Sequence, residues 1–281
     1  MGTSDSNARS RTQRQSRWLR AYKGKRVCIT GSSSGIGLEM ARVLAEAGVA
    51  VLAAARRQDR LDALAAEYPT IVTEPLDLEK HDQIAEFATR AWDRLGGIDI
   101  LINNAGFSQR AHFLETDPAT IDRVINVNLL GTVRLTQAVA RRMKAAGGGQ
   151  IGVVTSVAAR LASKGRSGYS AAKAALHRFF DVARMELAPH KISISLAVPG
   201  YVRTEISRHA VTATGSEHGR MDSNQEHGDS ARHCAEGILR GFAKKKHEFY
   251  VSLTPKLRLG LLMRRVFPEL YFRVMTNAQE E

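Results

Sequence analysis

The sequence predicts an α/β fold in which helices cover both faces of a parallel sheet. Short apolar runs alternate with helix-like segments from Lys25 almost to the end of the 281-residue chain. The apolar runs are continuous rather than alternating, as in strands buried on both faces. Each helix-like segment is long enough to connect two parallel strands by a right-handed crossover. The length allows one large domain or two small ones, and we expect a single doubly wound domain.

The elements follow from apolar periodicity and from the glycines that end it. The first strand leads into the glycine-rich turn Gly31–Gly37, the first helix stops at Gly48, and Gly96-Gly97 ends another helix. Strands are expected over Arg26–Thr30, Val49–Ala55, Ile71–Glu74, Ile98–Ile102, Ile151–Thr155 and Ile192–Val198. Helices are expected over Leu38–Ala47, Arg57–Glu67, Asp82–Leu95 and Pro118–Ala146, and in the segment that carries Tyr169 and Lys173.

Three segments stand outside this alternation. Residues 1–22 are polar and basic, and we expect a disordered arm. Residues 203–229 lose all periodicity within the domain at 23–252, which predicts a mobile loop over a substrate site. Residues 253–281 form an apolar and basic extension.

Composition excludes several classes of protein. No apolar run approaches the ~20 residues needed to span a bilayer, and the Arg-rich start lacks the apolar region of a secretory signal. Cys28 and Cys234, without metal-ligand spacing, predict a reducing compartment and no metal site. The expected location is cytoplasmic, with peripheral contact to a membrane surface left open.

The net charge of +13 is concentrated near the two ends of the chain. Residues 1–26 carry eight Lys or Arg and one acidic residue, and residues 240–275 carry nine and two, while the segment between them is nearly neutral. Basic ends suit an anionic surface, whether lipid or nucleic acid, or they serve solubility. The first 26 residues contain only Trp18 and Tyr22 as aromatics, so nucleic-acid binding is not expected as the main role.

Tyr169 and Lys173 stand four residues apart without an intervening Gly or Pro, so a helix places both on one face. A phenol has a pKa of ~10, and a fixed ammonium beside it favours the phenolate. Such a tyrosine can give a proton to a carbonyl oxygen or take one from an alcohol. Ser156 follows the strand Ile151–Thr155 and should lie at the carboxyl edge of the sheet, where open α/β sheets hold their chemistry.

The turn after the first strand has the features of a phosphate cradle. Gly31 permits the tight turn, Gly35 lets backbone amides approach a pyrophosphate, and Gly37 permits close helix–strand packing. The residues expected to contact a dinucleotide in this turn are Gly31, Ser33, Ser34, Gly35, Ile36 and Gly37. Their spacing differs from G-x-G-x-x-G and from a P-loop.

The end of the second strand predicts the choice of cofactor. Sites that prefer NAD place an acidic residue here for the ribose 2′-hydroxyl, whereas this chain has Ala55 followed by Arg56 and Arg57. A guanidinium can bind a 2′-phosphate with two hydrogen bonds, so we predict NADP(H).

Three further positions are candidates. Asp77, followed by Leu78, either receives the adenine amino group or caps a helix. Small residues at Asn104-Ala105-Gly106 let the backbone pass close to a cofactor. Asn128 lies in the long helix among apolar neighbours, which predicts a buried amide that needs partners.

These motifs together resemble the short-chain dehydrogenase/reductase family. The matching residues are Thr30-Gly31-x-x-x-Gly35-Ile36-Gly37, Asn103-Asn104-Ala105-Gly106, Asn128, Ser156, Tyr169-x-x-x-Lys173 and Pro199-Gly200, in order, over about residues 24–205. The resemblance implies a Rossmann fold of seven strands and a catalytic set of Asn128, Ser156, Tyr169 and Lys173. Lys173 would hold the nicotinamide ribose, Ser156 would polarise the carbonyl, and Asn128 would hold a water. It also implies that Pro199, Gly200, Val202 and Thr204 lie at the nicotinamide, and that the protein is a homodimer or homotetramer.

The resemblance predicts an NADP(H)-dependent oxidoreductase that interconverts a ketone and a secondary alcohol. The segment Leu257–Phe272 is loosely similar to the tails of 11-beta-hydroxysteroid dehydrogenase-like and 3-ketodihydrosphingosine reductase-like members, which implies an apolar, lipid- or steroid-like substrate. Such a segment can lie at a bilayer interface, cover the pocket or seal a subunit contact. The alternatives are a reductase of 3-oxoacyl thioesters or small carbonyls, and a non-catalytic nucleotide-sensing homologue.

Overall fold

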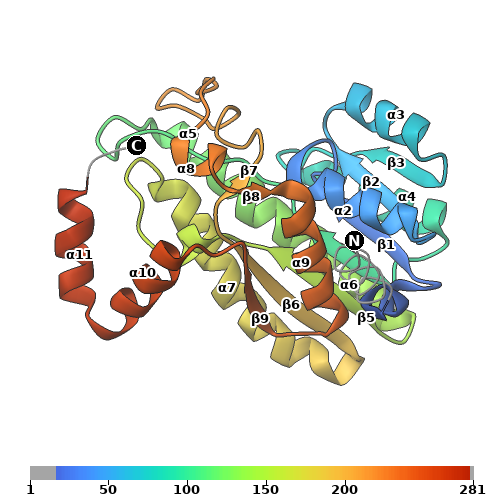
Figure 1. Ribbon diagram of the computed structural model, residues 1–281. Helices are drawn as coiled ribbons and strands as arrows, with labels where there is room; N and C mark the ends of the chain where they lie inside the picture. Colours follow the sequence, from blue (N-terminus) through green and yellow to red (C-terminus); the bar gives the residue numbers. More distant parts are fainter. Residues whose placement is uncertain (1–16, 279–281) are drawn as a thin grey trace, which may run out of the picture.

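Seven parallel strands form one central sheet in the computed structural model, which describes residues 17–278 (Figure 1). The order of the strands is β3-β2-β1-β4-β5-β6-β9. Their bounds are β1 Arg26–Thr30, β2 Ala50–Ala55, β3 Ile71–Pro75, β4 Ile100–Asn103, β5 Gly149–Val154, β6 Ile192–Pro199 and β9 Glu248–Val251. The predicted doubly wound sheet is confirmed. A separate pair, β7 (Val202–Arg203) and β8 (Asp229–Ser230), lies beyond the end of β6.

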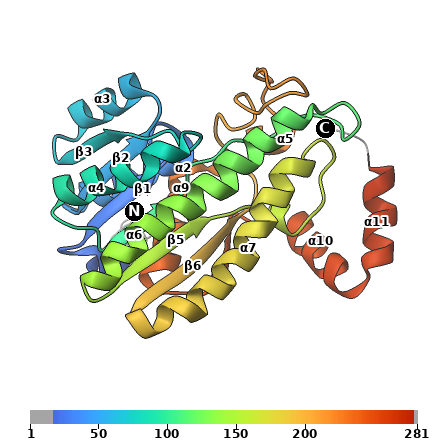
Figure 2. The ribbon, with the colours of Figure 1, turned by 180° about the vertical axis from the view of Figure 1, so that it is seen from behind.

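Helices cover both faces of this sheet. The helices α4 (Ile84–Leu95), α5 (Pro118–Ile125), α6 (Thr132–Ala145) and α7 (Ser167–Leu187) lie on one face (Figure 2). The apolar sides of α4, α6 and α7 pack into the core on this face, where they bury Phe87, Leu135 and Leu176. The opposite core holds α2 (Gly35–Glu46), α3 (Gln58–Glu67) and α9 (Ala231–Ala243). Burial of these apolar stripes supplies the main driving force for the fold.

The chain reverses its winding direction at β1. This strand pairs with β2 on one side and with β4 on the other. The connections that follow β1 and β4 therefore leave to opposite sides and open a crevice at the carboxyl ends of the strands, which is where such sheets bind ligands.

The predicted long helix is continuous but contains a π-helical turn over Asn126–Gly131, between α5 and α6. Gly131 packs so closely against the Leu78 carbonyl that a Cβ atom would collide with it. Turns of this kind are frequent at functional sites, and this one contains the buried Asn128.

The prediction of disorder is wrong for residues 17–22. A helical turn at 17–19 and a 3-10 turn, Arg20–Tyr22, place Trp18 and Tyr22 in the core beside α2 and α9. The Tyr22 hydroxyl donates a hydrogen bond to the Leu239 carbonyl at 2.7 Å. Two aromatic side chains thus anchor a segment whose composition is otherwise polar, and the predicted disorder of 1–16 lies outside the described residues.

The segment 203–229 has few regular elements but many internal contacts. It contains the short helix α8 (Ser223–Glu226), and Val211 forms isolated bridges with Gln109 and Glu217. Ser207 and Ala210 are fully buried. The loop is therefore packed onto the segment that follows β4, and its predicted mobility stays a prediction.

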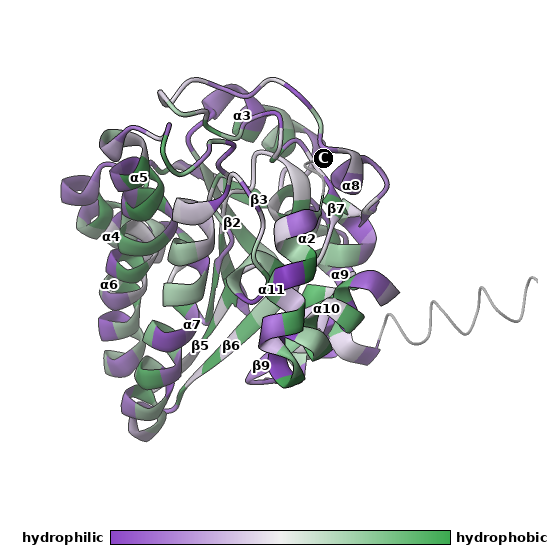
Figure 3. Ribbon diagram, turned by 90° about the vertical axis from the view of Figure 1, so that its left-hand side faces the viewer, coloured by the Kyte–Doolittle hydropathy of each residue, from purple (hydrophilic) through white to green (hydrophobic). Residues whose placement is uncertain are grey.

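The C-terminal extension forms two helices, α10 (Pro255–Val266) and α11 (Pro268–Asn277), that project from the side of the domain (Figure 1). The Tyr271 hydroxyl accepts a hydrogen bond from the Ala162 amide at 2.8 Å, which ties α11 to the loop before α7. Hydrophobic and hydrophilic residues are intermixed on both helices (Figure 3). Their large exposed apolar side chains are Leu259, Leu262, Val266, Phe267, Leu270, Phe272 and Val274.

Candidate active site

Two cavities meet at the carboxyl edge of the sheet. The first, which we call the Tyr169 pocket, is lined by Ser156, Tyr169 and Lys173. The second, the glycine-loop cleft, runs from the Gly31–Ile36 turn to Arg56 and Arg57. Asn104, Gly106 and Thr204 are among the residues that border both. The two cavities therefore form one continuous site.

Tyr169 and Lys173 lie on the same face of α7, as their spacing predicts. The Lys173 Nζ atom is 5.8 Å from the centroid of the Tyr169 ring and donates a hydrogen bond to the Val154 carbonyl at 3.2 Å. Ser156 follows β5, and its Oγ accepts a hydrogen bond from the Ala158 amide at 3.1 Å. The structure thus brings together three of the four residues predicted as catalytic.

Burial perturbs both titratable groups of the Tyr169 pocket. Tyr169 is 5% exposed and Lys173 is 4% exposed. Burial raises the pKa of Tyr169, while the hydrogen bond with Ser156 and the charge of Arg166 oppose that rise. Burial lowers the pKa of Lys173 to about 8. Perturbed groups that converge in a cleft are typical of sites for proton transfer.

Asn128 lines neither cavity. Its Oδ1 accepts a hydrogen bond from the Phe107 amide at 3.2 Å, and its Nδ2 donates to the carbonyls of Phe107 and Val124 at 3.1 and 3.0 Å. The predicted partners of this buried amide are therefore backbone groups. They hold the loop after β4 against the π-helical turn, and the predicted role of Asn128 in holding a water stays a prediction.

The glycine-loop cleft fits a dinucleotide sterically. Gly35 has φ +57°, and a Cβ atom on Gly31 would lie 2.8 Å from Ala105 Cα. A Cβ atom on Gly37 would collide with the Gly31 carbonyl, so Gly37 acts through packing and does not line the cleft. The Thr30 Oγ1 accepts from the Asn104 and Ala105 amides and fixes the two strand ends to each other. The bare backbone left by the glycines is what a bound pyrophosphate requires.

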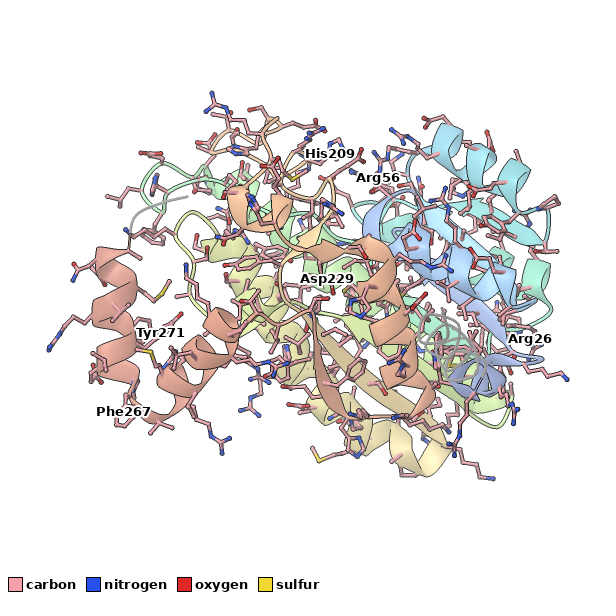
Figure 4. All side chains as sticks on the ribbon, in the orientation of Figure 1. Arg26, Arg56, His209, Asp229, Phe267 and Tyr271 are labelled. Atoms are coloured by element: carbon pink, nitrogen blue, oxygen red, sulfur yellow. The ribbon has the colours of Figure 1, made fainter. Side chains whose placement is uncertain are left out.

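Arg57 lies at the polar end of the glycine-loop cleft. Its Nη2 donates to Ser34 Oγ at 2.8 Å and to Ser33 Oγ at 3.1 Å. Its Nη1 lies 3.9 Å from Glu205 Oε2. Arg56 is exposed and borders the same cavity from the end of β2, while His209 borders it from the loop after β7 (Figure 4). Two guanidiniums and two hydroxyls therefore meet where an adenosine 2′-phosphate was predicted.

The remaining candidates divide between the two cavities. Asp77 and Leu78 line the cleft. The Asp77 carboxylate accepts from the Glu79 amide at 3.0 Å, so it stabilises a turn and does not cap the helix as one alternative proposed. The residues after β6 that line the Tyr169 pocket are Pro199, Gly200, Val202 and Thr204.

Sequence reasoning missed a charged wall of the Tyr169 pocket. Arg166 borders the pocket and pairs with Asp222, from a loop 56 residues further along the chain. Gln225 and Tyr201 also border it. The position of Arg166, three residues before Tyr169 at the N-cap of the same helix, is the signal that could have found it.

Neither a metal cluster nor a membrane-spanning helix occurs in residues 17–278. No group of three His, Cys, Asp or Glu residues there could hold a metal ion. Every helix in that part of the chain is too short or too polar to cross a bilayer. Cys28 and Cys234 are buried free thiols, and burial raises the pKa of each to about 12.

Known proteins are similar to this chain in sequence. The family model of the short chain dehydrogenases matches residues 25–214. A Dehydrogenase/reductase SDR family protein 7-like from Drosophila melanogaster is 39% identical over 263 residues, which cover 90% of this chain and 80% of the relative. Dehydrogenase/reductase SDR family member 7B from Bos taurus is 35% identical over 275 residues, which cover 92% and 84%.

Solved structures agree with the sequence comparisons. A short-chain dehydrogenase from Streptomyces avermitilis superposes with a TM-score of 0.76 at 28% identity, over 91% of this chain and 98% of the other. A short chain dehydrogenase from Burkholderia cenocepacia, solved in complex with NADP, gives a TM-score of 0.74 at 27% identity, over 90% and 98%. From its sequence and its fold, this chain belongs to the short-chain dehydrogenase/reductase family of oxidoreductases.

Proposed function

We propose that the protein is an NADP(H)-dependent oxidoreductase that interconverts a ketone and a secondary alcohol. The observation that carries the proposal is the convergence of Ser156, Tyr169 and Lys173 in a pocket continuous with the Arg57 end of the glycine-loop cleft. NADP(H), when bound in the cleft, supplies or accepts the hydride. The residues of the chain have to orient the carbonyl and move one proton.

Tyr169 is the proton donor in reduction and the acceptor in oxidation. The Lys173 ammonium favours the phenolate that Tyr169 becomes after donating its proton. Ser156 donates a hydrogen bond to the carbonyl oxygen and increases the positive character of the carbon that receives the hydride. Asn128 keeps the loop after β4 in place, and its assignment to the catalytic set is part of this proposal.

Preference for NADP(H) over NAD(H) rests on Arg57 and Arg56. The Arg57 fork already binds the hydroxyls of Ser33 and Ser34, so it is held in position before a phosphate arrives. Such preorganisation reduces the ordering cost of binding. The Burkholderia cenocepacia neighbour, solved with NADP, is consistent with this preference.

The C-terminal helices favour an apolar substrate drawn from a lipid surface. Exposed Leu262 and Phe267 are accompanied by Arg264 and Arg265, and a mixture of apolar and basic side chains suits an anionic membrane interface. The base of α10 adjoins the Tyr169 pocket, because a Cβ atom on Gly200 would lie 2.9 Å from Leu257. We expect the protein to bind phosphatidylserine-containing vesicles, and Phe267→Asp with Leu262→Asp to abolish that binding.

We also propose a homo-oligomer, formed through the outer face of α7. Phe179, Val182 and Met185 are 41%, 50% and 68% exposed and follow one another at three-residue spacing on that helix. Such an apolar stripe is normally covered in the native assembly. Light scattering of the purified protein should give a dimer or tetramer, and Val182→Glu should shift it to a monomer.

The experiment that tests the enzymatic proposal compares cofactors and ketones. Calorimetric titration should show NADPH binding at least about tenfold more tightly than NADH, as one charge-assisted contact would provide. A panel of apolar ketones should then oxidise bound NADPH. Binding without turnover of any ketone or 3-oxoacyl thioester would favour the nucleotide-sensing alternative, and binding of neither cofactor would refute the proposal.

A further inference from the structure

Two largely buried arginine side chains share one carboxylate beside the Tyr169 pocket. Arg110 Nε donates to Asp222 Oδ1 and Arg166 Nη2 donates to Asp222 Oδ2, each at 3.0 Å. The side chains of Arg110, Arg166 and Asp222 are 12%, 13% and 8% exposed. One carboxylate compensates one of the two guanidiniums, so the cluster retains a single positive charge away from bulk water.

That excess charge belongs to Arg166. Arg110 pairs with Asp222 through two nitrogens, and its Nη1 donates to the Gln109 carbonyl at 2.8 Å. Within residues 17–278, Asp222 is the one acceptor recorded for Arg166, which lines the Tyr169 pocket. The guanidinium of Arg166 therefore keeps N–H donors for a further partner.

The pocket offers Arg166 no carboxylate of its own. Two cationic side chains, Arg166 and Lys173, are among its described lining residues, and no Asp or Glu is. Burial lowers the pKa of Arg166, which means that its charge is poorly solvated there. An anion entering the pocket would compensate a charge that the protein leaves uncompensated.

The position of Arg166 relates this charge to the reacting centre. Arg166 is the N-cap residue of α7, and it lines the same pocket as Tyr169 and Lys173, which lie on the helix itself. The charge of Arg166 opposes the rise in the pKa of Tyr169, so the guanidinium lies within electrostatic reach of the Tyr169 hydroxyl. A ketone held at Tyr169 would thus lie in the cavity that Arg166 also borders.

We propose that Arg166 binds an anionic oxygen group, a carboxylate or a phosphate, on the substrate, a few bonds from its carbonyl. The inference rests on the proposed function and deepens it, since the substrate becomes amphipathic, with an apolar body and an acidic group. Arg166 selects it by a bidentate, charge-assisted contact, and Asp222 holds the guanidinium in the orientation for that contact.

A binding experiment tests the subsite without any turnover. Decanoate, decyl phosphate and neutral decanamide are titrated calorimetrically into the protein saturated with NADPH. Wild type should bind at least one of the two anions about tenfold or more tightly than decanamide. Arg166→Gln should abolish that difference, and Arg166→Lys, which keeps the charge without the planar fork, should retain part of it.

A matched control lies on the same helix. Arg178 is 87% exposed and faces away from the pocket, so Arg178→Gln makes the same charge change without affecting the preference for anions. Arg166→Gln should remain folded, because Asp222 stays paired with Arg110. Equal affinity of wild type for both anions and decanamide, or an undiminished preference in Arg166→Gln, would overturn the inference.

Turnover separates this inference from the proposed function. With NADPH, 4-oxodecanoate should be reduced with a higher kcat/KM than its amide, and Arg166→Gln should lower the acid-to-amide ratio about 10- to 100-fold, mainly through KM. Reduction of both ketones at an equal rate in wild type would overturn the anion subsite and leave the oxidoreductase intact. Decanoate binding through Arg166 with no ketone reduced would support the subsite and contradict the proposed reaction.

Discussion

The Lys173 ammonium nitrogen lies 5.8 Å from the centre of the Tyr169 ring and donates its hydrogen bond to the carbonyl of Val154. The bond holds the lysine at the end of β5, next to Ser156, instead of leaving it to sample solvent. Both members of the pair are buried, and burial is the main cause of the shifted pKa of each. The proposed chemistry depends on this lysine keeping its charge while a proton leaves the tyrosine.

The first prediction concerns pH. Burial lowers the pKa of Lys173 to about 8, so the lysine is charged below that pH and neutral above it. With the charged lysine favouring the phenolate product, kcat/KM for ketone reduction should be constant at low pH and fall as the pH rises through about 8. Lys173→Arg, charged at every accessible pH, should lose this fall in whatever activity remains. A wild-type profile that stays flat through about 8 would contradict the assignment.

A second prediction concerns the stability cost of Lys173. Its pKa is about 8 in the folded protein against an ordinary value of 10.5, so between these pH values the folded protein binds fewer protons than the unfolded chain. The folded protein therefore becomes more stable as the pH rises through that window, as far as Lys173 is concerned. Below a pH of about 8 the lysine is charged, and the folded protein bears the full cost of removing that charge from water. Lys173→Met should raise the free energy of unfolding at neutral pH by about 1–3 kcal/mol, measured by urea denaturation, while abolishing activity. If Lys173→Met were less stable than wild type, the charge of Lys173 would be compensated within the folded protein.

The third prediction concerns Glu205. Its carboxylate lies 3.9 Å from Arg57 Nη1, where a 2′-phosphate is proposed to bind, so the two anions compete for one guanidinium. Glu205→Gln should tighten NADPH binding about two- to fivefold, as expected for a half-exposed ion pair. NADH, which lacks the phosphate, should gain much less, and equal gains for both cofactors would argue against a phosphate site at Arg57.

Tyr22 provides a fourth prediction, on the N-terminal segment. Its hydroxyl is buried and donates to the Leu239 carbonyl at 2.7 Å, so Tyr22→Phe leaves that carbonyl with one partner fewer. The free energy of unfolding should fall by about 1–2 kcal/mol. Tyr68→Phe removes an exposed hydrogen bond to Glu46 and serves as the control, with an expected change within about 0.5 kcal/mol. Equal losses in the two variants would mean that the N-terminal anchor contributes nothing specific.

The sequence predicts the sheet well because most of its strands are buried and read as continuous apolar runs. β9 is not predicted from an apolar run, because it is an edge strand in which exposed Tyr250 alternates with buried Phe249. The π-helical turn around Asn128 is also not predicted, since the sequence indicates one continuous helix over Pro118–Ala146.

Local motifs predict the core of the site, because Tyr169 and Lys173 are neighbours on one helix and the glycine turn is a single loop. The pair of Arg166 with Asp222 could not be predicted in this way. It joins α7 to a loop without periodicity, and only the folded chain brings the two residues together. The burial of Trp18 is a similar case, since its partners lie at the far end of the domain in sequence.

The most direct test of proton transfer by Tyr169 is the rate of NADPH oxidation by a ketone in wild type and in Tyr169→Phe. The substitution removes only the proton-donating hydroxyl from a buried ring. Turnover should fall by at least about 100-fold, while calorimetry should show NADPH affinity unchanged within about threefold. If Tyr169→Phe reduced the ketone at the wild-type rate, proton transfer by Tyr169 would be contradicted.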